Sequence, residues 1–225
     1  MSTGAVPEPL RRVVSTNLRP VRPLPPVWMR SLVAVVLGAV GLAIVVAVFN
    51  LSLRPDMPQI PRWLGWGCTA LQLAIGVLLI AMGLREAVPG RSIPGRAVGL
   101  AVVTGLLMQV ATGIATWIAS PGVAYAPSRA MALGFGCASH DLALALPALL
   151  VTLWLVFRAL PLRPSVAGLL GGAGAGLVAD AVNHLVCPMS DLRHVLVWHT
   201  GALLGLMAVG YLAGLSWERF RARER

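Results

Sequence analysis

Six apolar runs constrain this chain more than any other feature of its sequence. Each run is about 20 residues long, enough for a helix to cross a hydrocarbon core of about 30 Å. Only 12% of the 225 residues are charged and 57% are hydrophobic, so a soluble domain of this size would lack the polar surface that it needs. The sequence therefore predicts an all-α membrane protein built as a six-helix transmembrane bundle.

The breaks between the apolar runs define the expected domains. Proline, glycine and arginine gather in "RPDMPQIPR", "REAVPGRSIPGR" and "RALPLRP", a composition typical of loops. We expect the spans over residues 31–51, 64–84, 97–119, 141–157, 165–185 and 195–215. Residues 1–30 then form an arm, residues 31–215 the six-span transmembrane domain, and residues 216–225 a basic tail.

The distribution of arginines predicts the direction of the spans. An even number of spans places both termini on one side of the membrane. The arm, the second and fourth loops and the tail hold 14 arginines, whereas the loops on the other side hold four. By the positive-inside rule, both termini lie in the cytoplasm. Topology thus accounts for the formal net charge of +10, and no direct binding of nucleic acid is expected.

The side chains that commonly bind metals gather near the outer ends of the spans. Three of the four histidines and one of the three cysteines occur in "DAVNHLVCPMSDLRHVLVWH", residues 180–199. Cys137 and His140 are three residues apart, as are His184 and Cys187, and this spacing places two side chains on one helical face. Together these four residues suit zinc or another soft transition-metal ion, although the sequence indicates no obligatory cofactor.

Asp180 and His199 are expected to support such a site from inside the membrane. Asp180 lies one turn before His184 and can hold the second nitrogen of that ring. Alternatively, Cys137 and Cys187 form a thiol pair that closes to a disulfide in an oxidising compartment. The spacing leaves both interpretations open.

Small residues recur at regular intervals in the fifth predicted span. Gly168, Gly172 and Gly176 lie four residues apart in "GLLGGAGAGLVAD", a pattern that lets two helices approach backbone to backbone. The pattern predicts either close packing inside the bundle or the interface of a homodimer.

The arm contains "LRPVRPLPPVWMR", residues 18–30, directly before the first span. Its prolines fix φ and favour an extended polyproline conformation, so it can lie along another protein at a modest cost in entropy. The residues of this segment that we expect to bind a partner are Leu18, Arg19, Pro20, Val21, Arg22, Pro23, Leu24, Pro25 and Pro26.

Several of these segments together resemble one family. The "LRPVRPLPP" arm, the cysteine before span four, "PLRPSVAGLLGG", "NHLVCP" and "VLVWHTG" are similar to the NrsF family of bacterial inner-membrane anti-sigma factors, and the resemblance covers essentially the whole chain. It implies a multi-pass inner-membrane protein whose cytoplasmic face sequesters a sigma factor of the extracytoplasmic-function class.

The resemblance also implies that Cys137 and Cys187 pass on a heavy-metal or oxidative signal. It gives no role to Cys68, His140 or His194. Two other classes stay open: a membrane thiol oxidoreductase, although no C-x-x-C motif occurs, and a metal or proton transporter, although such proteins bind ligands near the midplane. We expect a regulator and not an enzyme.

Overall fold

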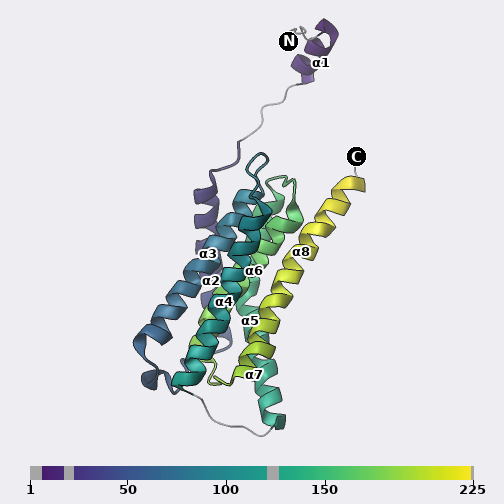
Figure 1. Ribbon diagram of the computed structural model, residues 1–225. Coiled ribbons are helices and arrows are strands. Elements are labelled where there is room, and N and C mark those ends of the chain that lie inside the picture. Colours follow the sequence, from purple (N-terminus) through teal and green to yellow (C-terminus); the bar gives the residue numbers. More distant parts are fainter. Residues whose placement is uncertain (1–6, 18–22, 121–126, 224–225) are drawn as a thin grey trace.

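The computed structural model describes residues 7–17, 23–120 and 127–223. Over these residues the chain is helical without strands, and six of its helices are long and apolar enough to cross a membrane (Figure 1). They are α2 (Val27–Val48), η2 with α3 (Trp63–Cys68 and Thr69–Glu86), α4 (Gly95–Ala119), α5 (Pro127–Phe157), α6 (Pro164–Val186), and α7, η3 and α8 in succession (Leu192–His194, Val195–His199 and Thr200–Arg223). The prediction of six membrane-crossing helices is confirmed.

Two of these helices are longer than the sequence predicted. α5 begins at Pro127, so Cys137 and His140 lie within a helix and not in a loop. The predicted span began only at residue 141. Within the added part of the helix, Gly134 faces the ring of Trp198, where a Cβ atom would clash with the indole. The second longer helix is α8, which continues through the basic tail to Arg223.

The arm also contains a helix that the sequence did not predict. α1 (Glu8–Asn17) precedes the bundle and stands clear of it in Figure 1. Its first turn carries Glu8, which favours a helix N-terminus, and Pro9, which is tolerated there. Residues 23–26 are exposed and not helical, as expected, whereas Leu18–Arg22 of the predicted binding segment lie outside the described residues.

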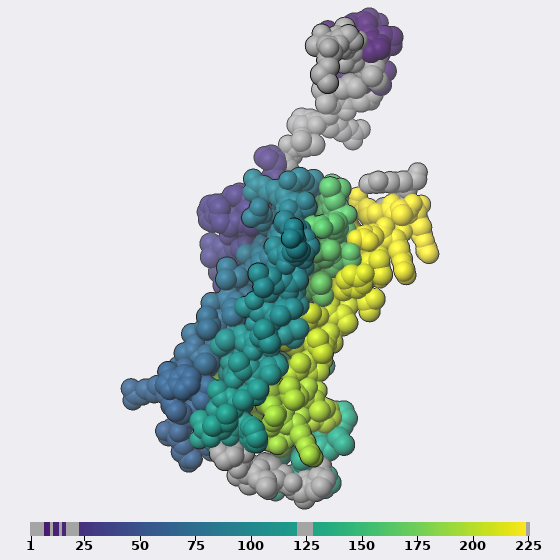
Figure 2. Space-filling model, viewed as in Figure 1, coloured from purple at the N-terminus to yellow at the C-terminus, as the bar shows by residue number. Residues whose placement is uncertain are grey.

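The central helix of the bundle is α6, which packs against α3, α4, α5 and α8. On the face shown in Figure 2, side chains of α3, α4 and α8 form the surface. A Cβ atom added at Gly168 or Gly172 would come within 3.0 Å of the carbonyl oxygen of Gly210 or Leu206 on α8. The predicted glycine pattern therefore serves packing inside one chain, which gives these glycines a role without a homodimer.

The helices begin and end at two opposite ends of the bundle, which we call the terminal end and the cysteine end. At the terminal end, α2 begins and α8 ends (Figure 1). There the guanidinium of Arg30 is buried and donates to the carbonyl oxygens of Leu84 (3.4 Å) and Leu155 (2.6 Å). Glu86 is buried too, and pairs with Arg163 at 2.6 Å. The opposite face, with Cys137 and Cys187, is the cysteine end.

Candidate functional site

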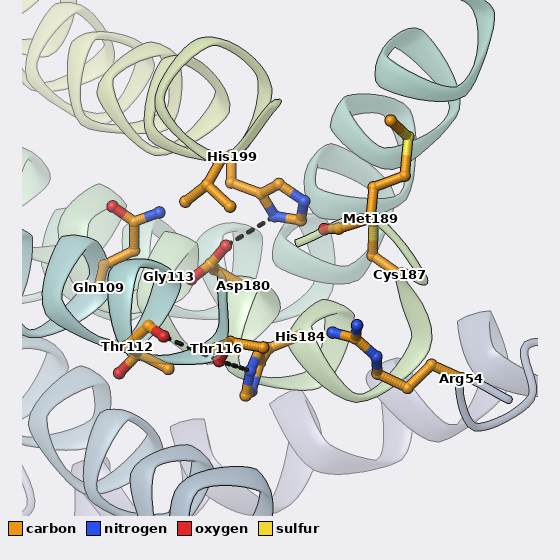
Figure 3. Close-up of a pocket in the computed structure, with 11 residues that line it drawn as sticks. Arg54, Gln109, Thr112, Gly113, Thr116, Asp180, His184, Cys187, Met189 and His199 are labelled. Carbon is orange, nitrogen blue, oxygen red and sulfur yellow. Dashed lines mark hydrogen bonds and ion pairs between the residues drawn. The ribbon is translucent and has the colours of Figure 1, made fainter. Parts of the chain in front are cut away.

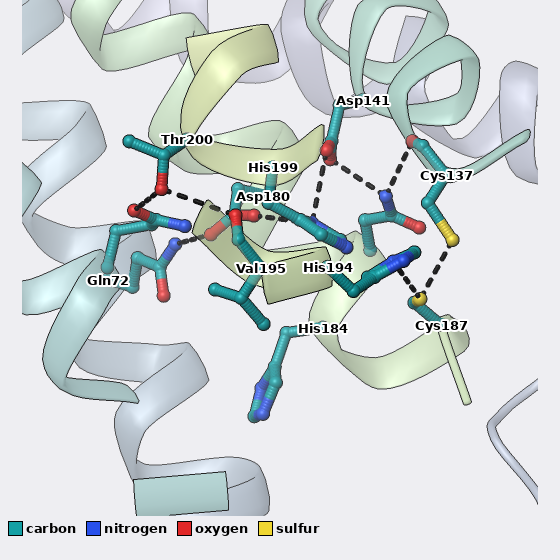
Figure 4. Close-up of polar contacts among 12 residues, drawn as sticks. Gln72, Cys137, Asp141, Asp180, His184, Cys187, His194, Val195, His199 and Thr200 are labelled. Atoms are coloured by element: carbon teal, nitrogen blue, oxygen red, sulfur yellow. Dashed lines mark hydrogen bonds and ion pairs between the residues drawn. The ribbon is translucent and has the colours of Figure 1, made fainter. Parts of the chain in front are cut away.

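The two cysteines that the sequence singled out lie together at the cysteine end (Figure 4). Cys137 belongs to α5 and Cys187 follows the last residue of α6, and their Sγ atoms lie 2.8 Å apart as two free thiols. Both side chains are buried and pack with Met189. Pro188 explains the position of Cys187, because the residue before a proline is steered to extended backbone, and Cys187 ends α6 with φ −72° and ψ 119°.

Asn183 joins α6 to α5 beside the sulfurs. Its buried side-chain amide donates to the carbonyl oxygen of Cys137 and to Oδ1 of Asp141, each at 2.9 Å. The carbonyl oxygen of Asn183 in turn accepts from the backbone N–H of Cys187 at 2.7 Å. Hydrogen bonds therefore connect the backbones of both cysteines to Asn183 of α6.

The histidines beside the sulfurs are His194 and His199. Nε2 of His194 lies 3.4 Å from Sγ of Cys187, and one ligand atom from each of the two cysteines and two histidines lies within 4.8 Å of the others. The π-helical turn η3 places residues five apart on one face, whereas the 3.6-residue repeat of an α-helix would turn them away from each other. The sequence carried no signal for this turn, so the role of His194 was missed.

Two buried carboxylates face the other side of the His199 ring (Figure 4). Nδ1 of His199 lies 2.9 Å from Oδ1 of Asp180 and 3.1 Å from Oδ2 of Asp141. Asp180 also accepts from the side-chain amide of Gln72 on α3. Because ionisable groups are costly inside a membrane, a cluster of three points to a functional role. Reasoning from the sequence assigned no role to Asp141.

The structure places His140 and His184 away from the sulfurs. The ring nitrogens of His184 lie within hydrogen-bond distance of Oγ1 of Thr69 (3.2 Å) and Oγ1 of Thr116 (2.9 Å). The ring of His140 packs edge-on against Phe49, with 5.8 Å between centroids. Asp180, which was expected to hold His184, instead contacts His199. His199 was expected only to support the site, and it lies among the potential ligands.

Arg54 fixes the loop that carries Cys187, a role that its sequence position did not suggest. Its buried guanidinium donates to both carboxylate oxygens of Asp56, at 2.6 and 2.7 Å, and to Oγ of Ser190 at 2.6 Å. The hydrogen bonds from Arg54 hold the pKa of Asp56 below its usual range. This clamp ties the first loop to the fifth loop next to the cysteine pair.

The Cys187 thiol is chemically activated by its neighbours. The Cys137 thiol, through its hydrogen bond, lowers the pKa of Cys187 well below its usual value, and hydrogen bonds with His194 and His199 act in the same direction. The thiolate is the form of cysteine that binds soft metals and acts as a nucleophile. The arrangement can therefore bind a soft ion or undergo oxidation of the two thiols.

A small cavity leads to this cluster between α4, α6 and the fifth loop (Figure 3). Its volume is about 30 Å³, the space of about one water molecule. Thr116, Arg54, Asp180, Cys187 and His199 are among the residues that line it. The cavity can therefore hold about one water molecule beside the cluster.

Comparison with known proteins identifies the family. The family model described as negative regulator of sigma F, NrsF, matches residues 14–220, from the arm to the last helix. Comparisons with curated proteins and with solved structures found no match. Because the family match spans nearly the whole chain, this membrane protein belongs to the NrsF family and is a negative regulator of a sigma factor.

Proposed function

We propose that this protein is an inner-membrane anti-sigma factor for a sigma factor of the extracytoplasmic-function class, and that it releases this partner when Cys137 and Cys187 react with a heavy metal or an oxidant. The observation that carries the proposal is the contact between the two sulfurs at the end of the bundle opposite the arm. A chain that only anchored a sigma factor would have no need for paired thiols there.

The orientation follows from charge. The arm, the second and fourth loops and the tail meet at the terminal end, and they hold 14 of the 18 basic residues. With this end in the cytoplasm, the arm reaches a cytoplasmic sigma factor and the cysteine end faces the periplasm.

The sigma factor binds along the proline-rich arm. Pro23, Leu24, Pro25 and Pro26 are exposed and not helical, directly before α2, and the backbone of Pro26 has φ −57° and ψ 153°. Their fixed φ angles reduce the entropy lost on binding, and Leu24 offers an apolar contact between prolines. Leu18–Arg22 are included in the binding segment on the basis of the sequence alone.

Two kinds of signal act on the cysteine pair. An oxidant of the peroxide class takes two electrons and two protons from the thiols of Cys137 and Cys187, and an S–S bond forms. A soft metal ion instead replaces the thiol protons and binds both sulfurs. The lowered pKa of Cys187 favours both reactions, because each consumes the thiolate.

The signal reaches the terminal end through α6. Asn183 links this helix to Cys137. Glycines of α6 pack directly on the backbones of α3 and α8, so a shift of α6 moves these helices without being absorbed by flexible side chains. At its other end, Ser165 contacts Glu218 of α8. Reversing a 99:1 preference for the sigma-bound state requires about 5.5 kcal/mol, a demand that a new S–S bond or a multidentate metal site can meet.

The family match favours regulation over the two other classes considered, a thiol oxidoreductase and a transporter. The test is purification of the tagged full chain from bacterial membranes, with soluble partners identified by mass spectrometry. We expect a sigma factor with the full chain and none after deletion of residues 2–26. Recovery of a sigma factor from both chains would move the binding site to the loops, and recovery from neither would overturn the anti-sigma proposal.

The sensing half is tested in the same cells. Cadmium or peroxide should lower recovery of the sigma factor from the wild-type chain but not from Cys137→Ser or Cys187→Ser. Cys68→Ser is the matched control, because Cys68 lies at the end of η2 and belongs to neither of the clustered sets. Normal release from the Cys137→Ser and Cys187→Ser chains would overturn the sensing role.

A further inference from the structure

We propose that Cys137, Cys187, His194 and His199 form a buried tetrahedral site for one soft divalent ion such as Zn²⁺ or Cd²⁺, with Asp141 and Asp180 orienting His199. This ligand set replaces His140 and His184 of the sequence-based expectation with His194, which directly precedes the π-helical turn η3, and His199, which ends it. The geometry of the four side chains is the argument for binding of the ion. The effect of the bound ion on the sigma factor rests on the proposed function.

The spacing of the four ligand atoms fits a tetrahedral ion. Bonds of about 2.3 Å to sulfur and about 2.0–2.1 Å to nitrogen hold the ligand atoms about 3.3–3.8 Å apart. In the structure the two Sγ atoms lie 2.8 Å apart, Nε2 of His194 lies 3.4 Å from Sγ of Cys187, and the whole set falls within 4.8 Å. The ideal spacing lies inside this range, so side-chain adjustments suffice to admit the ion.

His199 is oriented as metal-binding histidines commonly are. Its Nδ1 is engaged by the carboxylates of Asp141 and Asp180, which leaves Nε2 as the nitrogen available to an ion. Carboxylates that hold the second nitrogen of a ligating histidine fix the orientation of the ring and increase its basicity. The two aspartates therefore serve the site through His199.

His194 supplies an independent observation. Within the part of the chain that the structure describes, its ring is buried and its Nδ1 has no hydrogen-bond partner, while Nε2 is directed at Cys187. A buried polar group without full pairing is costly. Nε2, which faces Cys187, is the ring nitrogen placed to bind an ion held by that thiolate, and the unpaired Nδ1 lies on the opposite side of the ring.

The chemistry of the ligands selects the ion. Two sulfurs and two imidazole nitrogens suit zinc, cadmium and similar soft or borderline ions, whereas magnesium and calcium require oxygen ligands. Two thiolates also neutralise the charge of a divalent ion. The bound site then adds no net charge to a buried region, where an uncompensated charge is strongly unfavourable.

Metal binding and oxidation should therefore displace the sulfurs in opposite directions. An ion holds them about 3.8 Å apart, farther than in the structure, whereas an S–S bond closes them to about 2.05 Å. The two signals also exclude each other, because a disulfide offers no thiolate to the ion.

The experiment uses the full chain, purified in detergent, reduced and freed of metal by a chelator. Co²⁺ is the probe, because its visible absorption reports tetrahedral geometry and its charge-transfer band reports thiolate ligands. We expect one Co²⁺ per chain, displaced by Zn²⁺ or Cd²⁺. X-ray absorption of the Zn²⁺ form should give two sulfur and two nitrogen neighbours, a measurement that needs no variant.

The matched variants are His194→Ala and His140→Ala. His194→Ala should weaken Co²⁺ binding by more than about 100-fold and abolish the tetrahedral spectrum, while His140→Ala should leave both unchanged. Asp141→Asn should keep the spectrum and weaken affinity by about 10- to 100-fold, as changes behind a ligating histidine do. An unchanged spectrum in His194→Ala, or a set of neighbours with only one sulfur, would overturn the site.

The outcomes separate this inference from the proposed function. One ion per chain with the expected ligands, together with a sigma factor that does not respond to metal in cells, would support the site and overturn the sensing half of the proposed function. Metal-induced release in cells from a chain that binds no Co²⁺, Zn²⁺ or Cd²⁺ when purified would keep the function and overturn the site.

Discussion

At the terminal end a buried Arg30 donates to two carbonyl oxygens that end helices, whereas at the cysteine end His199 lies between two carboxylates and close to two thiols. The two buried charged groups described at the first end, Arg30 and Glu86, both have hydrogen-bond partners. At the second end, within the described residues, Oδ1 of Asn183 and Nδ1 of His194 are buried without hydrogen-bond partners. The difference shows where the bundle is held in one arrangement and where a ligand or a covalent bond can change it.

The largest expected effect comes from removing His199, the shared partner of two buried carboxylates at the cysteine end. His199→Leu leaves Asp141 and Asp180 buried and facing each other, and should lower the free energy of unfolding by about 3–5 kcal/mol. Denaturant unfolding in detergent, monitored by tryptophan fluorescence, measures this change in the free energy of unfolding.

Glu86→Gln at the terminal end is the comparison for this variant. It should cost only about 1 kcal/mol, because the Arg163 side chain is 41% exposed and its charge is screened by solvent. An equal loss of unfolding free energy in His199→Leu and Glu86→Gln would contradict the difference between the two ends.

The next effect concerns the helix that connects the two ends. Gly172→Ala inserts a methyl group against the backbone of α8 and should cost about 1–3 kcal/mol, through displacement of α6 from α8. Gly205→Ala is the matched control, because no atom lies within 4 Å of its added Cβ, and it should leave stability unchanged or raise it by up to about 1 kcal/mol, since alanine favours a helix over glycine. Similar unfolding midpoints for the two variants would contradict tight packing between α6 and α8.

A smaller effect tests the activated thiol. In a Cys68→Ser background, alkylation of Cys187 should rise with pH and level off at lower pH than for an ordinary thiol, because its pKa is lowered by Cys137. Cys137→Ala should raise that pKa and slow the reaction at pH 7 by about 10- to 30-fold, the ratio of thiolate fractions. Peptide mass spectrometry at a series of pH values gives the rates. The same pH midpoint in both chains would remove the argument for an activated Cys187.

The smallest effect concerns the clamp of the cysteine loop. The pKa of Asp56 is lowered in the folded protein, so its contribution to stability is present above the unfolded pKa of about 3.9 and is lost as the pH falls through the folded value. Asp56→Asn should cost about 0.5–1 kcal/mol at neutral pH, since the carboxylate is partly exposed. Unfolding measured between neutral pH and pH 3 should show a weaker loss in acid for the variant, and parallel curves would contradict the pairing with Arg54.

Much of the fold followed from the order of residues alone. The apolar runs determined six membrane-crossing helices, because only a helix satisfies its own backbone in a hydrocarbon core. The helix ends were less certain. The fourth span was expected from residue 141, whereas α5 begins at Pro127, and Gly134 in the added part packs against the ring of Trp198.

The candidate site divides in the same way. The sequence by itself determined that cysteines and histidines gather at one end, since position along each span fixes depth. The tertiary structure decided which of them meet. The π-helical turn directs His194 and His199 to Cys137 and Cys187, while Thr69 and Thr116 hold His184 elsewhere. Spacing along a chain specifies the face of one helix, but the rotation of one helix against another depends on side-chain packing across the whole bundle.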